Sequence, residues 1–108
     1  MSINNDAIAL TEAVYYILLS LYTPMHGYGI MQNVEELSKG RVRLAAGTLY
    51  GALNTLLEKG WIKSFEVSGR KKEYVITDTG KTAAQNEFER LRELVRNGKI
   101  ILGGGELK

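Results

Sequence analysis

Residues 47–61 read Gly-Thr-Leu-Tyr-Gly-Ala-Leu-Asn-Thr-Leu-Leu-Glu-Lys-Gly-Trp, and this stretch decides the fold. Its leucines recur three and four residues apart, which is the pattern of an amphipathic helix with one buried face. The pattern predicts a helix over residues 48–59, with Thr48 as its N-cap and Gly60 just beyond its end. The buried face consists of Leu49, Leu53, Leu56 and Leu57.

The face opposite these leucines is polar near the start of the predicted helix. A hydroxyl, a phenol and an amide there can hydrogen-bond phosphates, and asparagine can also pair with adenine. The helix N-terminus adds N–H donors and a partial positive charge. Taken alone, such a face is more often simply solvated, so residue type leaves both interpretations open. The residues of this face are Thr48, Tyr50, Gly51, Asn54 and Thr55.

A β-hairpin is predicted directly after this helix. Residues 61–67 and 72–77 are rich in strand-forming residues, and the Ser-Gly pair between them is a turn signal. Three adjacent cations, Arg70, Lys71 and Lys72, lie at the tip, where they suit DNA phosphates, and an arginine can enter a minor groove. The same cations would also protect an exposed strand edge from aggregation.

Two further helices are predicted upstream, over residues 7–21 and 27–37, followed by a short strand over residues 41–45. Pro24 separates the two helices, and Gly40 ends the second. Three helices followed by a hairpin form a winged helix-turn-helix, in which the third helix enters the major groove and the hairpin is the wing. The fold class is therefore mainly α with a small β-hairpin. The apolar positions of the first two helices are Val14, Ile17, Leu18, Leu21, Ile30, Val34 and Leu37.

A long last helix is predicted over residues 79–97, capped by Thr77 or Asp78. Its apolar residues follow a heptad spacing, and the helix is too long and too apolar along this seam to be satisfied by one small domain, so packing against a second copy of the chain is expected, with packing on its own core as the alternative. We therefore divide the chain into a winged-helix DNA-binding domain (1–77), a C-terminal dimerisation helix (78–97) and a flexible tail (98–108). The expected dimer contacts are Ala84, Phe88, Leu91, Leu94 and Val95.

Composition limits the function. The 108 residues suffice for one core, the single His and the absence of Cys argue against a metal site, and nothing resembles a catalytic constellation or a cofactor loop. We therefore expect no enzyme, no cofactor and no metal. The net charge is only +2, but residues 41–72 hold seven Lys or Arg against two Glu, so a polyanion would bind there. No signal peptide or membrane span is evident, and a cytoplasmic location is expected.

Four motifs in the same order and spacing resemble those of the PadR family of transcriptional regulators. They are His26-Gly27-Tyr28-Gly29-Ile30, Gly47-Thr48-Leu49-Tyr50-Gly51-Ala52-Leu53, Leu57-Glu58-Lys59-Gly60-Trp61-Ile62, and Gly69-Arg70-Lys71-Lys72-Glu73-Tyr74 with Val75-Ile76-Thr77 and Gly80. The resemblance covers residues 8–97 and indicates the short subgroup with a single C-terminal helix. Gly51 replaces the proline usual in the family.

The resemblance implies a homodimeric repressor that binds double-stranded DNA at a pseudo-palindromic operator and acts by occlusion. It favours DNA contact for the polar face of the third helix and for the wing. At the start of the second helix, Tyr28 is assigned to a phosphate, although His26 is better explained as a helix cap and Tyr28 could instead pack inward. The DNA-binding residues are Thr48, Tyr50, Gly51, Asn54, Thr55, Arg70, Lys71, Lys72, Arg43 and Tyr28.

Some members of the family bind small aromatic or cationic compounds between the subunits, so such an effector is a further implication. Tyr15, Tyr16, Phe88 and Leu91 are the residues expected to line its pocket, although aromatic residues on amphipathic helices are more often plain core. The alternative function is a winged-helix protein-interaction module without sequence-specific DNA binding. Only the DNA-binding protein should show salt-dependent duplex binding.

Overall fold

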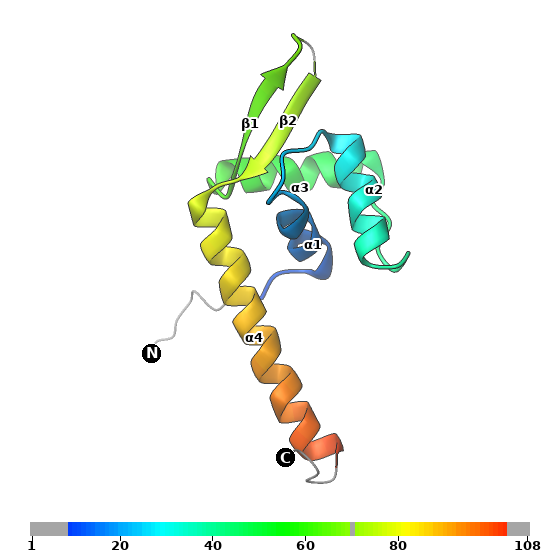
Figure 1. The fold of residues 1–108 in the computed structure, drawn as a ribbon, viewed down its shortest axis with the longest axis vertical. Coiled ribbons are helices and arrows are strands. Elements are labelled where there is room, and N and C mark those ends of the chain that lie inside the picture. Colours follow the sequence, from blue (N-terminus) through cyan, green and yellow to red (C-terminus); the bar gives the residue numbers. More distant parts are fainter. Residues whose placement is uncertain (1–8, 70, 104–108) are drawn as a thin grey trace.

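The computed structural model describes residues 9–69 and 71–103, and it shows a winged helix-turn-helix with a long final helix (Figure 1). Three helices form the centre, the two-stranded antiparallel hairpin projects from one end, and α4 runs away from the opposite side. The prediction of a mainly α fold with one hairpin is confirmed. The elements are α1 (Glu12–Ser20), α2 (Gly27–Leu37), α3 (Ala46–Glu58), β1 (Ile62–Val67), β2 (Lys71–Ile76) and α4 (Asp78–Leu102).

One hydrophobic core holds these elements together. Helix α1 lies at its centre, and its N-cap is Thr11, whose side chain accepts a hydrogen bond from Val14 N. All three helices of the central domain, both strands and the first part of α4 contribute buried side chains. The buried apolar residues are Ile17, Leu18, Leu21, Ile30, Val34, Leu49, Leu53, Leu56, Ile62, Tyr74, Ile76 and Ala84.

Helix α2 spans the predicted residues 27–37. His26 caps it, because its Nδ1 accepts a hydrogen bond from Gly29 N at 3.0 Å. The expectation that Leu37 is buried is wrong, since its side chain is 48% exposed. The chain instead turns at Ser38, which is buried and whose hydroxyl accepts a hydrogen bond from Val42 N at 2.9 Å.

The short strand predicted over residues 41–45 does not form. Its alternation reflects Val42 and Leu44, which pack against the core while Arg41 and Arg43 face solvent. The free edge of β2 is occupied by Met25, which exchanges two backbone hydrogen bonds with Tyr74 (3.1 and 2.8 Å). The place that a third strand would need is therefore taken by the residue that precedes α2.

Helix α3 starts earlier than predicted. Its N-cap is Ala45, which makes no side-chain hydrogen bond, so Thr48 lies inside the first turn and is not the cap. The hairpin that follows pairs Ile62 with Ile76 at its base and Val67 with Lys71 near its tip. Its turn begins with Ser68 and Gly69, both with positive φ (55° and 78°).

Helix α4 starts against residues Gly60 and Trp61, which follow α3, and it packs on α1. Thr77 is its N-cap, and the Thr77 hydroxyl also donates a hydrogen bond to the Gly60 carbonyl at 2.6 Å. The helix continues to Leu102, past the predicted end at Asn97, so the first part of the expected flexible tail is helical; residues 104–108 lie outside the described residues. Within the ranges 9–69 and 71–103, no helix has the length and apolarity to cross a membrane.

Candidate nucleic-acid interface

The face of α3 that points away from the core carries the five predicted polar positions. Thr48, Tyr50, Gly51, Asn54 and Thr55 are all exposed, while Leu49, Leu53 and Leu56 are buried on the opposite side. The Thr55 hydroxyl donates to the Gly51 carbonyl of the same helix (3.3 Å). Hydroxyl, phenol and amide groups are therefore presented together on one rigid helix, as direct contact with a nucleic acid requires.

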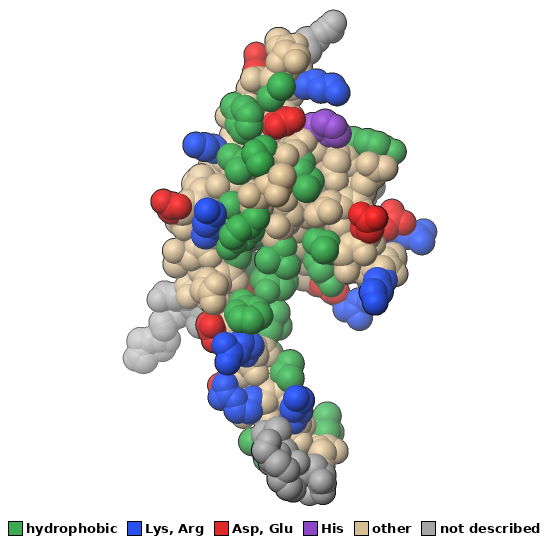
Figure 2. Space-filling model, in the orientation of Figure 1, with side chains coloured by type: hydrophobic (Ala, Val, Ile, Leu, Met, Phe, Trp, Pro, Cys, Tyr) green, Lys and Arg blue, Asp and Glu red, His purple; other side chains and the backbone are tan. Residues whose placement is uncertain are grey.

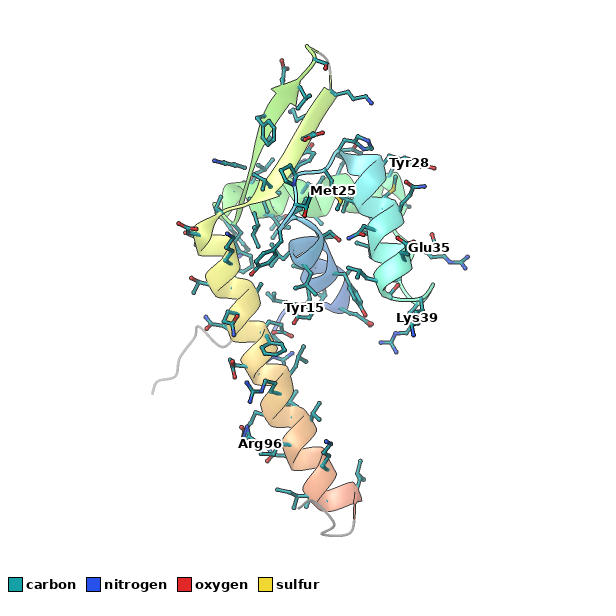
Figure 3. The ribbon with its side chains drawn as sticks, in the orientation of Figure 1. Tyr15, Met25, Tyr28, Glu35, Lys39 and Arg96 are labelled. Atoms are coloured by element: carbon teal, nitrogen blue, oxygen red, sulfur yellow. The ribbon has the colours of Figure 1, made fainter. Side chains whose placement is uncertain are left out.

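Tyr28 belongs to the same side of the helix-turn-helix. Its side chain is 62% exposed and points away from the core (Figure 3), so the alternative in which it packs inward is wrong. Its hydroxyl lies 3.4 Å from Gln32 Nε2, one helical turn further along α2. The first two turns of α2 thus offer an exposed phenol and an amide.

The hairpin carries exposed cations at its tip. Lys71 and Lys72 start β2, and both are exposed. Because neighbouring residues of a strand point to opposite faces, the two ammonium groups straddle the hairpin. Lys72 shares a face with Glu66 and Tyr74, which is the face turned toward the core at the base of the wing. The third predicted cation, Arg70, lies outside the described residues.

Arg43 precedes α3 and is held by an acidic partner. Its guanidinium lies 3.3 Å from a Glu35 carboxylate oxygen, and the Arg43 side chain is 73% exposed. Arg41 makes a similar exposed pair with Glu12, whose hydrogen bonds raise the pKa of Arg41. Exposed pairs of this kind are weak, so an incoming phosphate can displace the carboxylate.

Along α4, apolar side chains continue beyond the body of the protein (Figure 2). Ala84 is buried in the core of the chain itself, with 3% of its surface exposed, so it leaves little surface for a dimer contact. Leu91 is half-buried, and the other predicted dimer contacts, Phe88, Leu94 and Val95, are 44%, 52% and 58% exposed. Ile101 and Leu102 at the end of the helix are more exposed still.

A cavity of about 530 Å³ lies between α3, Trp61 and α4. Glu87 lines it with its side chain 3% exposed, accepting hydrogen bonds from Arg90 Nε and from Leu10 N (3.0 and 3.2 Å). The Arg90 hydrogen bonds lower the pKa of Glu87 despite its burial. Of the residues predicted to line an effector pocket, none lines this cavity: Tyr15, Tyr16, Phe88 and Leu91 all lie elsewhere.

Sequence reasoning missed a junction beneath Tyr50. A Cβ built on Gly27 would lie only 2.2 Å from the Tyr50 hydroxyl, which places this phenol directly against the first residue of α2. Burial raises the pKa of Tyr74, and the Tyr50 phenol adds to the rise. The glycine of the His-Gly-Tyr motif is the one sequence signal of this junction.

The exposed polar helix, the cationic hairpin and the helical core beneath them define a winged helix-turn-helix DNA-binding protein. A model of the transcriptional regulator PadR-like family matches residues 16–86. The chain belongs to this family of transcriptional regulators, which are not enzymes.

Solved structures of similar proteins agree with this assignment. H. salinarum RosR is 27% identical with a TM-score of 0.67, covering 84% of this chain and 91% of that one. A PadR family transcription regulator from Clostridium difficile R20291 is 25% identical with a TM-score of 0.66, covering 82% and 97%. A curated relative, an uncharacterised 37.1 kDa protein in transposon TN4556 of Streptomyces fradiae, is 34% identical over 78 residues; these are 72% of this chain but only 21% of that protein.

Proposed function

We propose that this regulator is a homodimeric repressor that acts in the cytoplasm by occluding a pseudo-palindromic operator. In this proposal, Thr48, Tyr50, Gly51, Asn54 and Thr55 of each α3 enter successive major grooves. The observation that carries it is the exposed polar face of α3 beside the cationic wing. Tyr28, Arg43, Arg70, Lys71 and Lys72 would hold the flanking phosphates, which fix the orientation of α3 on the duplex.

In the proposed dimer, the two copies pack against each other through the outer part of α4. Phe88, Leu94, Val95, Ile101 and Leu102 are exposed along one 25-residue helix, and exposed apolar surface of this extent marks an interaction site. A second copy of the chain packed on this apolar surface would explain the heptad spacing of its residues. It would also supply the second recognition helix that a pseudo-palindromic operator needs. Two-fold symmetry would then place the half-sites about one helical turn of DNA apart, or a multiple of that.

Relief by a small aromatic or cationic effector is the second part of the proposal. The cavity between α3 and α4 has the volume of a small-molecule site and contains an aromatic wall, Trp61, and a buried carboxylate, Glu87. A compound bound there would contact both the recognition helix and the dimerisation helix. It would release DNA only if it bound the DNA-free arrangement of these helices more tightly.

DNA binding is tested by fluorescence anisotropy with a duplex from upstream of the protein's own gene and a scrambled duplex, over a salt series. Lys71→Ala/Lys72→Ala should weaken binding and lower the slope of log Kd against log salt by about 3.6 for a dimer that loses four phosphate contacts, two from each wing, since each lost contact contributes about 0.9. The matched control is Lys81→Ala/Lys99→Ala, which removes two cations from α4 and should keep the full slope.

Equal and salt-independent binding of both duplexes would contradict the proposal. That result would favour the alternative, a winged-helix protein-interaction module. If the two double variants gave the same slope of log Kd against log salt, only the assignment of the wing lysines to DNA phosphates would be contradicted.

A further inference from the structure

The first residue of α2 lies directly against the recognition helix. Gly27 is buried, and a Cβ added to it would lie 2.2 Å from Tyr50 Oη and 2.8 Å from Tyr50 Cζ. Non-bonded carbon and oxygen atoms do not approach this closely, so the present Tyr50 ring position is available only because residue 27 has no side chain. Interiors are close-packed, and a single added methyl group is felt.

The rest of the structure holds this junction in place. Met25, two residues before Gly27, is paired with Tyr74 of β2 through two backbone hydrogen bonds. Tyr74 is itself buried in the core, with 6% of its surface exposed. The start of α2 is therefore fixed against β2, and the Tyr50 ring packs against that start while it still exposes 45% of its surface.

We propose that Gly27 is a positioning residue for DNA recognition: its missing side chain forms a socket that holds the Tyr50 phenol in its DNA-binding orientation. This inference rests on the proposed function, in which α3 contacts DNA. A Tyr50 ring that is already fixed loses no rotamer freedom when DNA binds. A mobile ring would lose this freedom on binding, and the entropy cost would weaken the interaction. A methyl group at position 27 would rotate the ring out of the socket and into the space that DNA must occupy.

The test is a double-mutant cycle of Gly27→Ala and Tyr50→Ala, measured by anisotropy on the operator duplex. We expect Gly27→Ala to raise Kd about tenfold in the native background and less than about twofold in the Tyr50→Ala background. The slope of log Kd against log salt should stay unchanged, because the phenol is uncharged; a domain that docks wrongly as a whole would lose slope.

Gly29→Ala is the matched control. It lies in the same helix, a Cβ there would meet only His26 and Met25 side-chain atoms at 3.4 Å or more, and alanine keeps the N–H that His26 caps. Its Kd should remain within about twofold of the native value, as expected for a site that does not contact Tyr50.

The outcomes separate the inference from the proposed function. If Tyr50→Ala weakens binding but Gly27→Ala does not, the socket is refuted and the DNA-binding proposal stands. If the native protein binds no duplex selectively, the proposed function itself fails. Should Gly27→Ala lower the thermal stability, the loss must disappear in the Tyr50→Ala background; a loss that persists there shows that the clash is not with Tyr50 and overturns the inference.

Discussion

Replacing Gly80 by alanine is expected to destabilise the fold strongly. Gly80 lies in the first turn of α4, and a Cβ there would lie 2.1 Å from the Trp61 carbonyl oxygen and 2.9 Å from its carbonyl carbon. Both atoms belong to backbone, so neither can rotate away as a side chain would. The same carbonyl accepts a hydrogen bond from Thr77 N (2.9 Å), which ties the start of α4 to the end of α3.

The magnitude follows from these contacts. Ordinary C···O contacts are about 3.3 Å or longer, so the first turn of α4 must move by about 1 Å. Overpacking of this kind costs about 1–3 kcal/mol, and loss of the Thr77–Trp61 hydrogen bond adds about 1 kcal/mol. We expect a total loss of about 2–4 kcal/mol, or a decrease in Tm of roughly 8–16 °C at about 4 °C per kcal/mol.

Thermal and urea unfolding monitored by circular dichroism would measure this loss. Gly51→Ala is the control: a Cβ there meets nothing within 4 Å, and alanine improves helix propensity, so stability should rise by up to about 1 kcal/mol. The reasoning is refuted if Gly80→Ala is as stable as the native protein, because the close approach to Trp61 would then cost nothing.

Three further outcomes are expected. Because the pKa of Glu87 is lowered in the fold, its pairing stabilises the protein above the ordinary glutamate pKa of about 4.3 and is lost as pH falls through the folded value; Glu87→Gln should cost about 1–3 kcal/mol at pH 7 and much less near pH 3, measured by urea unfolding. His26→Ala should cost about 1 kcal/mol in the same urea unfolding assay by removing the cap of α2, and a variant as stable as the native protein would contradict this. Leu94→Glu/Val95→Glu should yield monomers in analytical ultracentrifugation without loss of helicity, whereas Arg96→Glu, on the same part of α4, should not.

The elements that sequence could predict are those with local signals. Helix α2 has Pro24 before it, a capping His26 and period-matched Ile30 and Val34, and its bounds agree with the prediction. Helix α3 begins with Ala and Gly residues that carry no capping side chain, so the first hydroxyl, Thr48, was mistaken for the boundary.

The errors arise where non-local contacts decide the structure. Residues 41–45 alternate like a strand, but Met25 occupies the edge of β2 that they would have needed. The exposed face of α3 could be predicted because the spacing of the leucines identifies the buried face, and the exposed face lies opposite to it. Gly27 and Tyr50 lie in different helices, and no helical or strand periodicity in the sequence relates the two positions. Only the three-dimensional structure therefore reveals their contact.

The junction at Gly80 also bears on how a dimer would read DNA. Thr77 hydrogen-bonds to Gly60 and Trp61 just beyond α3, and α4 also packs on α1, so these contacts together set the direction of α4 relative to the recognition helix. In the proposed dimer, the outer part of α4 joins the two copies, and its direction therefore determines the separation of the two α3 helices. A displacement of about 1 Å at this junction is carried along a helix of about 37 Å, so small changes there alter half-site spacing. The cavity lined by Trp61 and Glu87 lies beside this same junction, which is why a ligand bound in it would act on DNA affinity rather than on stability alone.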